Sequence, residues 1–283
     1  MSSSPRTTVI SVCYNSLAVL PTMLDSMPRG TPVVLVDNAS ADHAALAQLA
    51  AERRVHLVRS EVNRGFGVGC NRGAQEATTE FLLFLNPDAA LQPGALEALE
   101  AAMDRYPQAS ALNPRLMDGD GKPYFKHRSV LLARSAWMKR GWPDRDCVVP
   151  VLSGAALFVR RDAFAAVGGF DPAIFLYHED DDLSLRLARE CGPLMFIRDA
   201  EVRHLEGHST VRSPQSAAFK AFHMGQSRVY AARKHKIGGR AMFPLLAATL
   251  QLLSPVTLLS SRQRAKRWAF LKGMLSVVRQ NGS

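Results

Sequence analysis

The sequence predicts an α/β fold with a mostly parallel central sheet flanked by helices. Through the first half of the chain, apolar runs rich in β-branched residues alternate with segments of helical spacing. This alternation is typical of βαβ units, which build a parallel sheet covered by helices. The chain has 283 residues, 47% of them hydrophobic and 21% charged, which suits one large domain or one domain with an appendage.

The predicted elements follow one another in the order that such a fold requires. Short apolar segments predict strands over residues 7–14, 32–36, 55–58, 81–85, 151–160 and 200–203. Segments with helical spacing predict helices over residues 17–26, 42–54, 93–105, 162–167 and 180–190, and a loop entering a helix over residues 65–77. The Pro- and Gly-rich segment 113–150 predicts a connecting region with short strands.

Cysteine usage and the N-terminus favour a cytosolic protein. The cysteines are widely spaced and include no CxxC pair; they are Cys13, Cys70, Cys147 and Cys191. This pattern predicts reduced thiols and not a disulfide framework or a zinc site. The polar residues 1–6 lead into an apolar segment that is too short and too polar for a secretory signal.

The net charge of +10 is concentrated in the C-terminal part of the chain. Thirteen of the 35 Lys and Arg residues follow Glu206, which is the last acidic residue, so the first 206 residues carry a net charge of −3. Basic tails without acidic residues meet anionic partners such as nucleic acid or a lipid surface, although a solvated basic surface gives the same composition. We therefore divide the chain into a domain of residues 1–210 and a basic, helical extension of residues 211–283.

An uncharged stretch inside the extension indicates contact with a membrane surface. Residues 241–260 number 20, nominally enough to span a bilayer, but they include two prolines and several polar residues, and both flanks are basic. An amphipathic hairpin at the cytoplasmic leaflet fits this pattern better, and a helical pair packed on the rest of the chain is the alternative. We expect no nucleic-acid partner, because no recognised binding motif accompanies the charge.

Two polar groups indicate chemistry. One is Asn86-Pro87-Asp88, at the end of a very apolar predicted strand, and the other is the run of four carboxylates from Glu179 to Asp182. In open α/β sheets, ligands bind beyond the carboxyl ends of the strands, where Asp37 and Asp88 are both expected. Clustered carboxylates bind a cation or take up a proton, although the same four residues also suit the first turn of a helix.

An ordered set of short motifs resembles glycosyltransferase family 2 of the GT-A fold, in its rhamnosyltransferase-like branch. The motifs are Val36-Asp37-Asn38-Ala39-Ser40, Asn63-Arg64-Gly65-Phe66-Gly67 with Asn71 and Gly73, Leu85-Asn86-Pro87-Asp88, Ser153-Gly154-Ala155, Gly168-Gly169-Phe170-Asp171, and FLYHEDDDL over residues 175–183. Each motif alone is weak, whereas the ordered set is specific. The resemblance implies that residues 1–210 are a catalytic domain that transfers a sugar, with inversion, from a nucleotide-diphosphate donor to an acceptor hydroxyl.

The resemblance also implies which residues bind the donor. Asp37 and Asn38 would hold the nucleotide base, although the pair also suits a plain turn. The remaining donor-binding residues would be Asn63, Arg64, Gly65, Asn71 and Asn86.

A divalent cation is implied beside the donor. Asp88 would bind Mg²⁺ or Mn²⁺, and Asn86 replaces the first carboxylate of the family's Asp-x-Asp motif, so the site has one charge fewer. His204 would be a further ligand of metal or phosphate, with a structural histidine as the alternative and His208 as a weaker candidate.

On the acceptor side, Asp180 falls on the Asp of the family's Glu-Asp pair, which acts as the catalytic base. Glu179 and Asp182 would then bind or orient the acceptor. The branch implies dTDP-L-rhamnose as the donor, with a UDP-hexose as the alternative, and a glycan or lipid-linked acceptor of cell-surface polysaccharide or glycolipid synthesis. We expect such an enzyme in the cytoplasm, at the inner face of the cell membrane.

The alternative functions are a nucleotidyltransferase and a membrane-surface scaffold without activity. A nucleotidyltransferase of the same fold would need a Gly-rich, basic loop after the first strand, where this chain has Tyr14-Asn15-Ser16-Leu17. A membrane-surface scaffold without activity is disfavoured because Asp88 and Asp180 are both intact.

Overall fold

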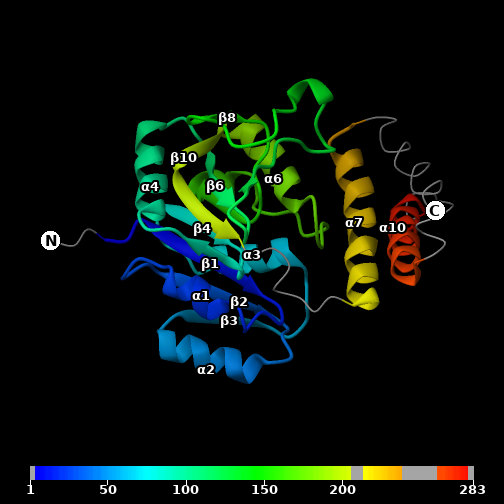
Figure 1. Cartoon of the computed structure of the whole chain (residues 1–283), viewed down its shortest axis with the longest axis horizontal. Helices are drawn as coiled ribbons and strands as arrows, with labels where there is room; N and C mark the ends of the chain where they lie inside the picture. Colours follow the sequence, from blue (N-terminus) through cyan, green and yellow to red (C-terminus); the bar gives the residue numbers. More distant parts are fainter. Residues whose placement is uncertain (1–3, 205–212, 238–259, 280–283) are drawn as a thin grey trace.

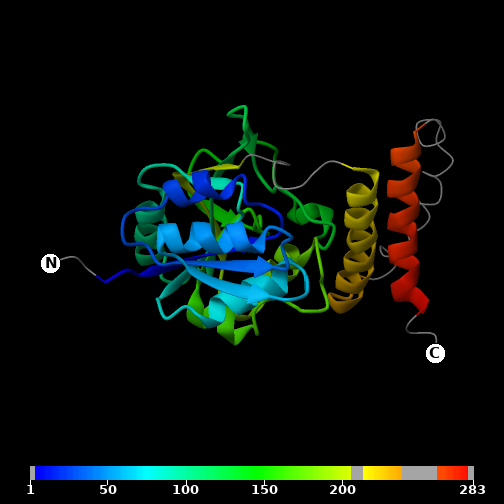
Figure 2. The same cartoon turned by 90° about the horizontal axis from the view of Figure 1, so that it is seen from below.

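The computed structural model describes residues 4–204, 213–237 and 260–279 (Figure 1). Across these residues, ten strands form one central sheet with helices on both faces, and a pair of long helices lies at one end of this body (Figures 1 and 2). The strands are β1 (Thr7–Cys13), β2 (Val33–Asn38), β3 (His56–Ser60), β4 (Phe81–Leu85), β5 (Ala89–Leu91), β6 (Ala111–Met117), β7 (Pro123–Tyr124), β8 (Cys147–Val149), β9 (Ala156–Arg160) and β10 (Leu194–His204).

The sheet has a parallel half and a mixed half. Its strand order is β3-β2-β1-β4-β9-β6-β10-β5, with β7 beside β6 and β8 beside β10. Strands β3, β2, β1 and β4 pair in parallel, whereas β9 runs antiparallel to both β4 and β6. The α/β fold with a helix-covered central sheet is thereby confirmed, and the βαβ pattern of the sequence corresponds to the parallel half.

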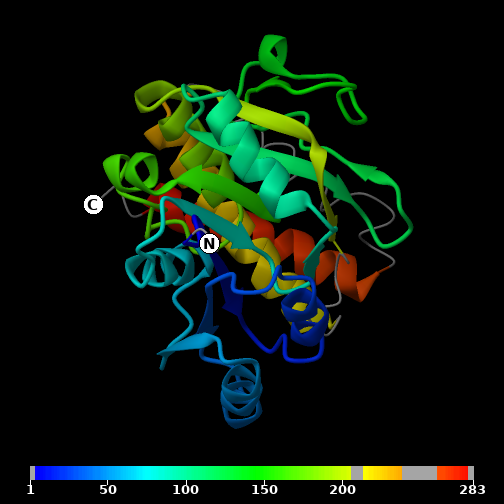
Figure 3. The same ribbon diagram turned by 90° about the vertical axis from the view of Figure 1, so that its left-hand side faces the viewer.

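Helices cover both faces of the sheet. One face carries α1 (Leu20–Asp25), α2 (His43–Arg53) and α4 (Ala95–Arg105), and the other carries α3 (Phe66–Gln75), α5 (Arg161–Ala166) and α6 (Glu179–Glu190) (Figures 2 and 3). A short 3₁₀ turn, η1, covers Arg134–Ala136. Because successive side chains of a strand point to opposite faces, Val9 packs into the core under α1 and α4, and Ile10 into the core over α3 and α6.

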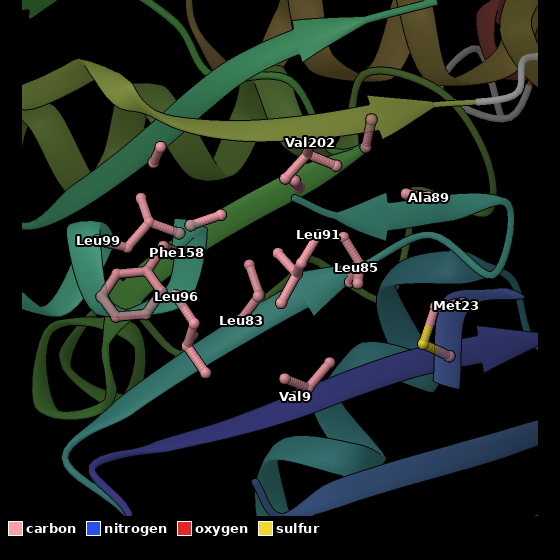
Figure 4. Close-up of a cluster of buried hydrophobic side chains, with 14 of the residues drawn as sticks. Val9, Met23, Leu83, Leu85, Ala89, Leu91, Leu96, Leu99, Phe158 and Val202 are labelled. Atoms are coloured by element: carbon pink, nitrogen blue, oxygen red, sulfur yellow. The ribbon is translucent and has the colours of Figure 1, made fainter. Parts of the chain in front are cut away.

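Strand β4 shows why its sequence is apolar without interruption. All five of its residues are buried, since helices lie on both sides of it. Figure 4 shows Leu83 of β4 near Leu96 of α4, and Leu85 near Leu91 of β5. Each such side chain contributes about 1.5–3 kcal/mol when it is fully buried. This packing fixes the carboxyl end of β4, where Asn86 and Asp88 follow.

Several strands differ from the sequence prediction, which also lacked the short strand β5. Residues 151–160 were predicted as one strand, but the strand begins only at Ala156. Strand β6 and most of β10 were missed because polar residues interrupt their apolar patterns. Two of these, Arg115 of β6 and Glu201 of β10, lie beside each other and form an ion pair between the strands.

The pair of long helices consists of α7 (Pro214–Lys234) and α10 (Ser261–Arg279). They lie side by side in both Figure 1 and Figure 2. A Cβ atom at Gly225 would meet the carbonyl oxygen of Phe270, and one at Gly273 would meet that of Phe222, so the two backbones touch. The glycines therefore permit a close helix contact that no larger residue allows.

Several predictions about the extension fall outside the described residues. They concern residues 241–259 of the uncharged stretch, the domain boundary at residue 210, and His208. Among the helices that the structure describes, none combines the length and the apolar character needed to cross a membrane. All four cysteines are free thiols.

Candidate active site

Asp37 closes a tight turn at the end of β2. Its carboxylate is fully buried, with Oδ1 accepting a hydrogen bond from the backbone N–H of Ser40 at 2.8 Å and Oδ2 lying 2.6 Å from Nδ1 of His43. Ala39, inside the turn, has a φ of 67°. Both carboxylate oxygens are thus engaged within the turn, and Asp37 shapes the sheet edge at which a nucleotide is expected.

Asn38 and Asn63 build the loop that leads into α3. The amide of Asn38 donates to Oδ1 of Asn63 at 2.9 Å and to the carbonyl oxygen of Gly65 at 3.2 Å, and it accepts from the backbone N–H of Arg64 at 3.1 Å. Gly65 has a φ of 90°, and a Cβ atom there would meet the carbonyl oxygen of Phe175. The loop therefore packs directly against the segment before α6, while the Arg64 side chain remains exposed.

Asn71 holds the Gly-Gly-Phe-Asp motif in place. Its Nδ2 donates to the carbonyl oxygen of Phe170, and its Oδ1 accepts from the N–H of the same residue, both at 2.8 Å. Gly169 has a φ of 70°, and a Cβ atom there would lie 2.6 Å from Oδ1 of Asn71. The structure thus gives this predicted donor-binding residue a positioning contact between α3 and the segment before α6.

Asn86, Asp88 and His204 come together, as the sequence predicted. Asn86 and Asp88 follow the end of β4, and His204 is the last residue of β10, so all three lie at one edge of the sheet. Nε2 of His204 lies 3.2 Å from Oδ1 of Asp88 and 3.3 Å from Nδ2 of Asn86. The side chains of Asp88 and His204 are only 5% and 12% exposed.

This group suits a divalent cation. The single Nε2 of His204 faces a carboxylate on one side and an amide N–H on the other, and the buried Nδ1 of the same ring has no hydrogen-bond partner. With Nε2 deprotonated, the ring and Asp88 would offer one nitrogen and one oxygen ligand, and a half-turn of the Asn86 amide would add a second oxygen. The described residues contain no group of three or more His, Cys, Asp and Glu side chains that could hold a metal.

Asp180 lies in the first turn of α6 and is held in one orientation. Its Oδ2 accepts from the backbone N–H of Gly154 at 2.9 Å and from Nζ of Lys126 at 2.6 Å, and its Oδ1 accepts from the N–H of Asp181 at 2.8 Å. The helix begins after Tyr177 and His178, which both have positive φ angles, of 65° and 66°. Such backbone strain in residues with side chains is concentrated at functional sites.

One short loop joins the two groups. Gly154 donates to Asp180, and the carbonyl oxygen of Ala155 accepts from the backbone N–H of Asn86 at 3.0 Å. The side chain of Asn113, in β6, holds this loop: it accepts from the N–H of Ser153 at 2.5 Å and donates to the carbonyl oxygen of the same residue at 3.0 Å. Sequence reasoning missed Asn113, whose only signal is an amide inside an apolar run.

Two ionisable neighbours of Asp180 have shifted pKa values. Burial first, and then the charge of Asp180, raise the pKa of Glu179 to about 8, and its buried Oε2 has no hydrogen-bond partner. Burial alone would raise the pKa of Asp181, but Lys126 at 2.9 Å and His178 at 2.8 Å hold it well below its usual value. Glu179 is therefore the protonated member of this group at neutral pH.

Asp182 points elsewhere. Its carboxylate is fully buried and pairs with Arg186 at 2.7 Å and with Lys234 and His235, both at 2.8 Å. Burial would raise its pKa, but these basic partners, His235 foremost, lower it to about 2. The structure thus places this predicted acceptor residue in the contact between α6 and α7, and not beside Asp180.

Comparison with known proteins gives the context of this geometry. Residues 8–168, more than half of the chain, match the model of glycosyl transferase family 2. The chain is 32% identical to the N-acetylglucosaminyl-diphospho-decaprenol L-rhamnosyltransferase of Mycobacterium tuberculosis, over 92% of this chain and 95% of that protein.

Two solved structures share the fold at low sequence identity. GalNAc-T7 with UDP, GalNAc and Mn²⁺ superposes with a TM-score of 0.63 at 16% identity, over 99% of this chain, which spans 58% of the length of that one. The mannosyltransferase PcManGT from Pyrobaculum calidifontis, in complex with GDP-Man and Mn²⁺, gives a TM-score of 0.61 at 18% identity, over 99% of this chain and 88% of that one. These likenesses confirm the expected GT-A fold, and the family match confirms the resemblance carried by the motifs. The chain therefore belongs to glycosyltransferase family 2.

Proposed function

We propose that the chain transfers L-rhamnose from dTDP-L-rhamnose, with inversion, to a sugar hydroxyl of an acceptor linked to a lipid through a diphosphate. The observation that carries this proposal is the Gly154-Ala155 loop, which hydrogen-bonds Asp180 on one side and Asn86 on the other. A base and a donor-phosphate site are thus held beside each other. The choice of substrates is supported by the name of the mycobacterial relative, which is an L-rhamnosyltransferase of a diphospho-decaprenol acceptor.

In this reaction Asp180 takes the proton of the acceptor hydroxyl as that oxygen attacks the anomeric carbon. The attack comes opposite to the leaving diphosphate, so the anomeric configuration inverts. Glu179, which is protonated at neutral pH, would donate a hydrogen bond to an acceptor oxygen. Asp182 positions α6 against the C-terminal end of α7 through its pairing with Lys234 and His235.

Asp88, His204 and Asn86 would hold Mg²⁺ or Mn²⁺. When bound, this cation neutralises the charge that grows on the leaving diphosphate. The turn of Asp37 and the loop of Asn38 and Asn63 shape the adjoining edge of the sheet for the nucleotide. Two solved structures of the same fold contain Mn²⁺ together with a nucleotide, which supports a metal at this edge.

The proposed reaction is tested by incubating the full chain with Mn²⁺ and a panel of dTDP- and UDP-sugars, with and without a diphosphate-linked acceptor. We expect turnover with dTDP-L-rhamnose and a larger rise in melting temperature with dTDP than with UDP, because at equal concentration the ligand that binds more tightly stabilises the fold more. Turnover with a UDP-hexose alone would replace the donor assignment. If the chain neither binds nor turns over any donor of the panel, a transferase function is contradicted.

We further propose that the enzyme works at an anionic membrane surface. Arg264, Trp268 and Lys272 recur every four residues and lie along one face of α10, and all three are exposed. The Nζ of Lys272 lies 5.6 Å from the centre of the Trp268 ring, which is 51% exposed. A tryptophan flanked by basic side chains suits the headgroup region, where each basic residue contributes about 1 kcal/mol.

The membrane proposal is tested by co-sedimentation with vesicles that contain phosphatidylglycerol. We expect binding at low salt and release at high salt. Lys272→Glu combined with Trp268→Ala should weaken binding to the vesicles. Lys122→Glu, between β6 and β7 of the sheet, should not weaken it. Equal binding of both variants would show that this face of α10 is not the contact surface.

A further inference from the structure

Lys126 is a buried lysine that the proposed reaction has not yet used. It follows the short strand β7, in the Pro- and Gly-rich segment between β6 and β9. Its side chain is 17% exposed, and its Nζ lies 2.6 Å from Oδ2 of Asp180 and 2.9 Å from Oδ1 of Asp181. The preceding residue, Phe125, packs edge-on against Phe196 of β10 at 5.6 Å between ring centres, which anchors the segment on the sheet.

Two carboxylates contact the ammonium group, and a third carboxyl and a histidine adjoin them in the sequence. Asp180, Asp181 and Glu179 come from the first turn of α6, and His178 precedes that turn. From the loop before β9 the backbone N–H of Gly154 donates to Asp180. On α3, burial and then the charge of Glu179 raise the pKa of the Cys70 thiol. Among these groups Lys126 is the cation that contacts both aspartates.

Like charges this close oppose one another's ionisation. Without a cation between them, Asp180 and Asp181 would compete for a shared proton, as neighbouring carboxylates in other active sites do. A base that already holds a proton cannot accept one from the acceptor. The ammonium group lies between the two aspartates and so offsets their mutual repulsion.

We propose that Lys126 is a positioning residue that balances the adjacent charges of Asp180 and Asp181 and holds Asp180 directed at the acceptor hydroxyl. This inference rests on the proposed role of Asp180 as the base. Lys126 and Gly154 both donate to Oδ2 of Asp180, and Asp181 N–H donates to Oδ1, so the carboxylate cannot rotate and a lone pair remains for the incoming proton. Lys126 itself keeps its protons throughout: the proton of the acceptor moves to Asp180, and the electron pair of the broken glycosyl bond leaves with the diphosphate.

The protonation state of Lys126 supports this division of roles. Burial alone would lower its pKa, but the charges of Asp180 and Asp181 outweigh burial and raise the pKa above the usual value. The side chain is therefore a fixed cation over the working pH range. It acts through charge and geometry, and not by carrying a proton.

The test compares pH–rate profiles of the full chain. In Lys126→Met, the acidic side of the kcat profile should move about 1–3 pH units higher, which is the effect of one opposite charge on a carboxylate. The loss of kcat should therefore be greatest at low pH, and kcat should recover as the pH rises. The donor KM should stay within about twofold. Lys126→Arg should keep most of the activity. Lys122 is an exposed lysine four residues before Lys126, and Lys122→Met should match the parent chain.

Chemical rescue keeps the test decisive if the methionine variant folds poorly. Lys126→Cys, alkylated with 2-bromoethylamine, regains an ammonium group at nearly the same position, and its profile should return toward that of the parent chain. The parent chain treated in the same way is the control, because Cys147 and Cys191 are partly exposed.

Two outcomes would overturn the inference: a Lys126→Met profile that superposes on that of the parent, or a loss of kcat that is equal at every pH, as a purely structural role predicts. Failure of the underlying base assignment is distinguishable. It would appear as an Asp180→Asn variant that keeps its activity, whatever the Lys126 variants do.

Discussion

The backbone N–H of Gly154 lies 2.9 Å from Oδ2 of Asp180, and a Cβ atom at position 154 would stand only 3.3 Å from the Cβ of Asp180. The loop and the first turn of α6 are therefore in direct contact, with little room for a side chain between them. Because Ala155 of the same loop binds the backbone of Asn86, movement of Asp180 relative to the group of Asn86, Asp88 and His204 is restricted. This contact is the basis of the first two predictions.

Asp180→Asn should abolish turnover and spare donor binding. The amide keeps the shape and can still accept from Gly154, but it cannot take a proton, and general-base assistance is typically worth about 10²–10⁴-fold in rate. Steady-state kinetics and isothermal titration with dTDP measure the two properties separately. Asp104→Asn, whose side chain is 61% exposed and pairs with Arg6, is the control. A kcat for Asp180→Asn within about tenfold of the parent would contradict the single-base mechanism.

Asp88→Ala should weaken donor binding only when metal is present. The carboxylate is the one anionic ligand in the Asn86, Asp88 and His204 group, so its loss removes the attraction for a divalent cation. We expect the affinity for dTDP in Mn²⁺ to fall about tenfold or more, and the affinity measured in EDTA to stay unchanged. Titrations in the two buffers provide the comparison. A loss of equal size with and without Mn²⁺ would show that Asp88 contacts the nucleotide directly.

Glu179→Gln should change how stability depends on pH. The folded pKa of about 8 lies above the usual value for a glutamate, so the folded state holds a proton that the unfolded state has released. This stabilises the fold relative to the charged form at low pH, and the contribution is lost as the pH rises from about 4.5 through 8. The melting temperature of the parent should therefore fall relative to that of the variant between pH 5 and pH 8.5. Parallel curves would contradict a protonated Glu179.

The sequence singled out the candidate site residues but not the frame around them. Asp88 and Asp180 stand in the motifs, and His204 follows a predicted strand, and such polar residues stand out from their apolar surroundings. Lys126 and Asn113 gave no comparable signal: one is a lysine in a polar connecting region, and the other an amide in a strand. Their importance comes from contacts with residues 54 and 40 positions away, which periodicity cannot reveal.

The mixed half of the sheet was underestimated for a similar reason. Arg115 and Glu201 each look like interruptions of a strand in the sequence, yet they pair across β6 and β10 and so are compatible with both strands. Asp182 illustrates the converse. The family resemblance implied an acceptor contact for it. Its partners, Lys234 and His235, lie at the C-terminal end of α7, more than fifty residues later.

Asp182→Asn should therefore destabilise the fold and loosen α7. Removing one partner of a buried ion pair leaves uncompensated charge and costs about 3–5 kcal/mol, so the free energy of unfolding in urea at pH 7 should fall by an amount of this order. Asp25→Asn, which removes an exposed pairing with Arg53, is the matched control and should leave the urea midpoint nearly unchanged. Hydrogen exchange should become faster in α7, because Lys234 and His235 lose their common partner.

The pH dependence of this effect has a definite sign. The folded pKa of Asp182, about 2, lies below the usual value of about 3.9, so its contribution to stability is complete above about pH 4 and is lost as the pH falls through 2. The difference in stability between the parent chain and Asp182→Asn should thus be largest near neutral pH and shrink below pH 4. A difference that stays constant down to pH 2, or an α7 that exchanges as slowly in the variant as in the parent, would show that Asp182 does not hold the helix through its charge.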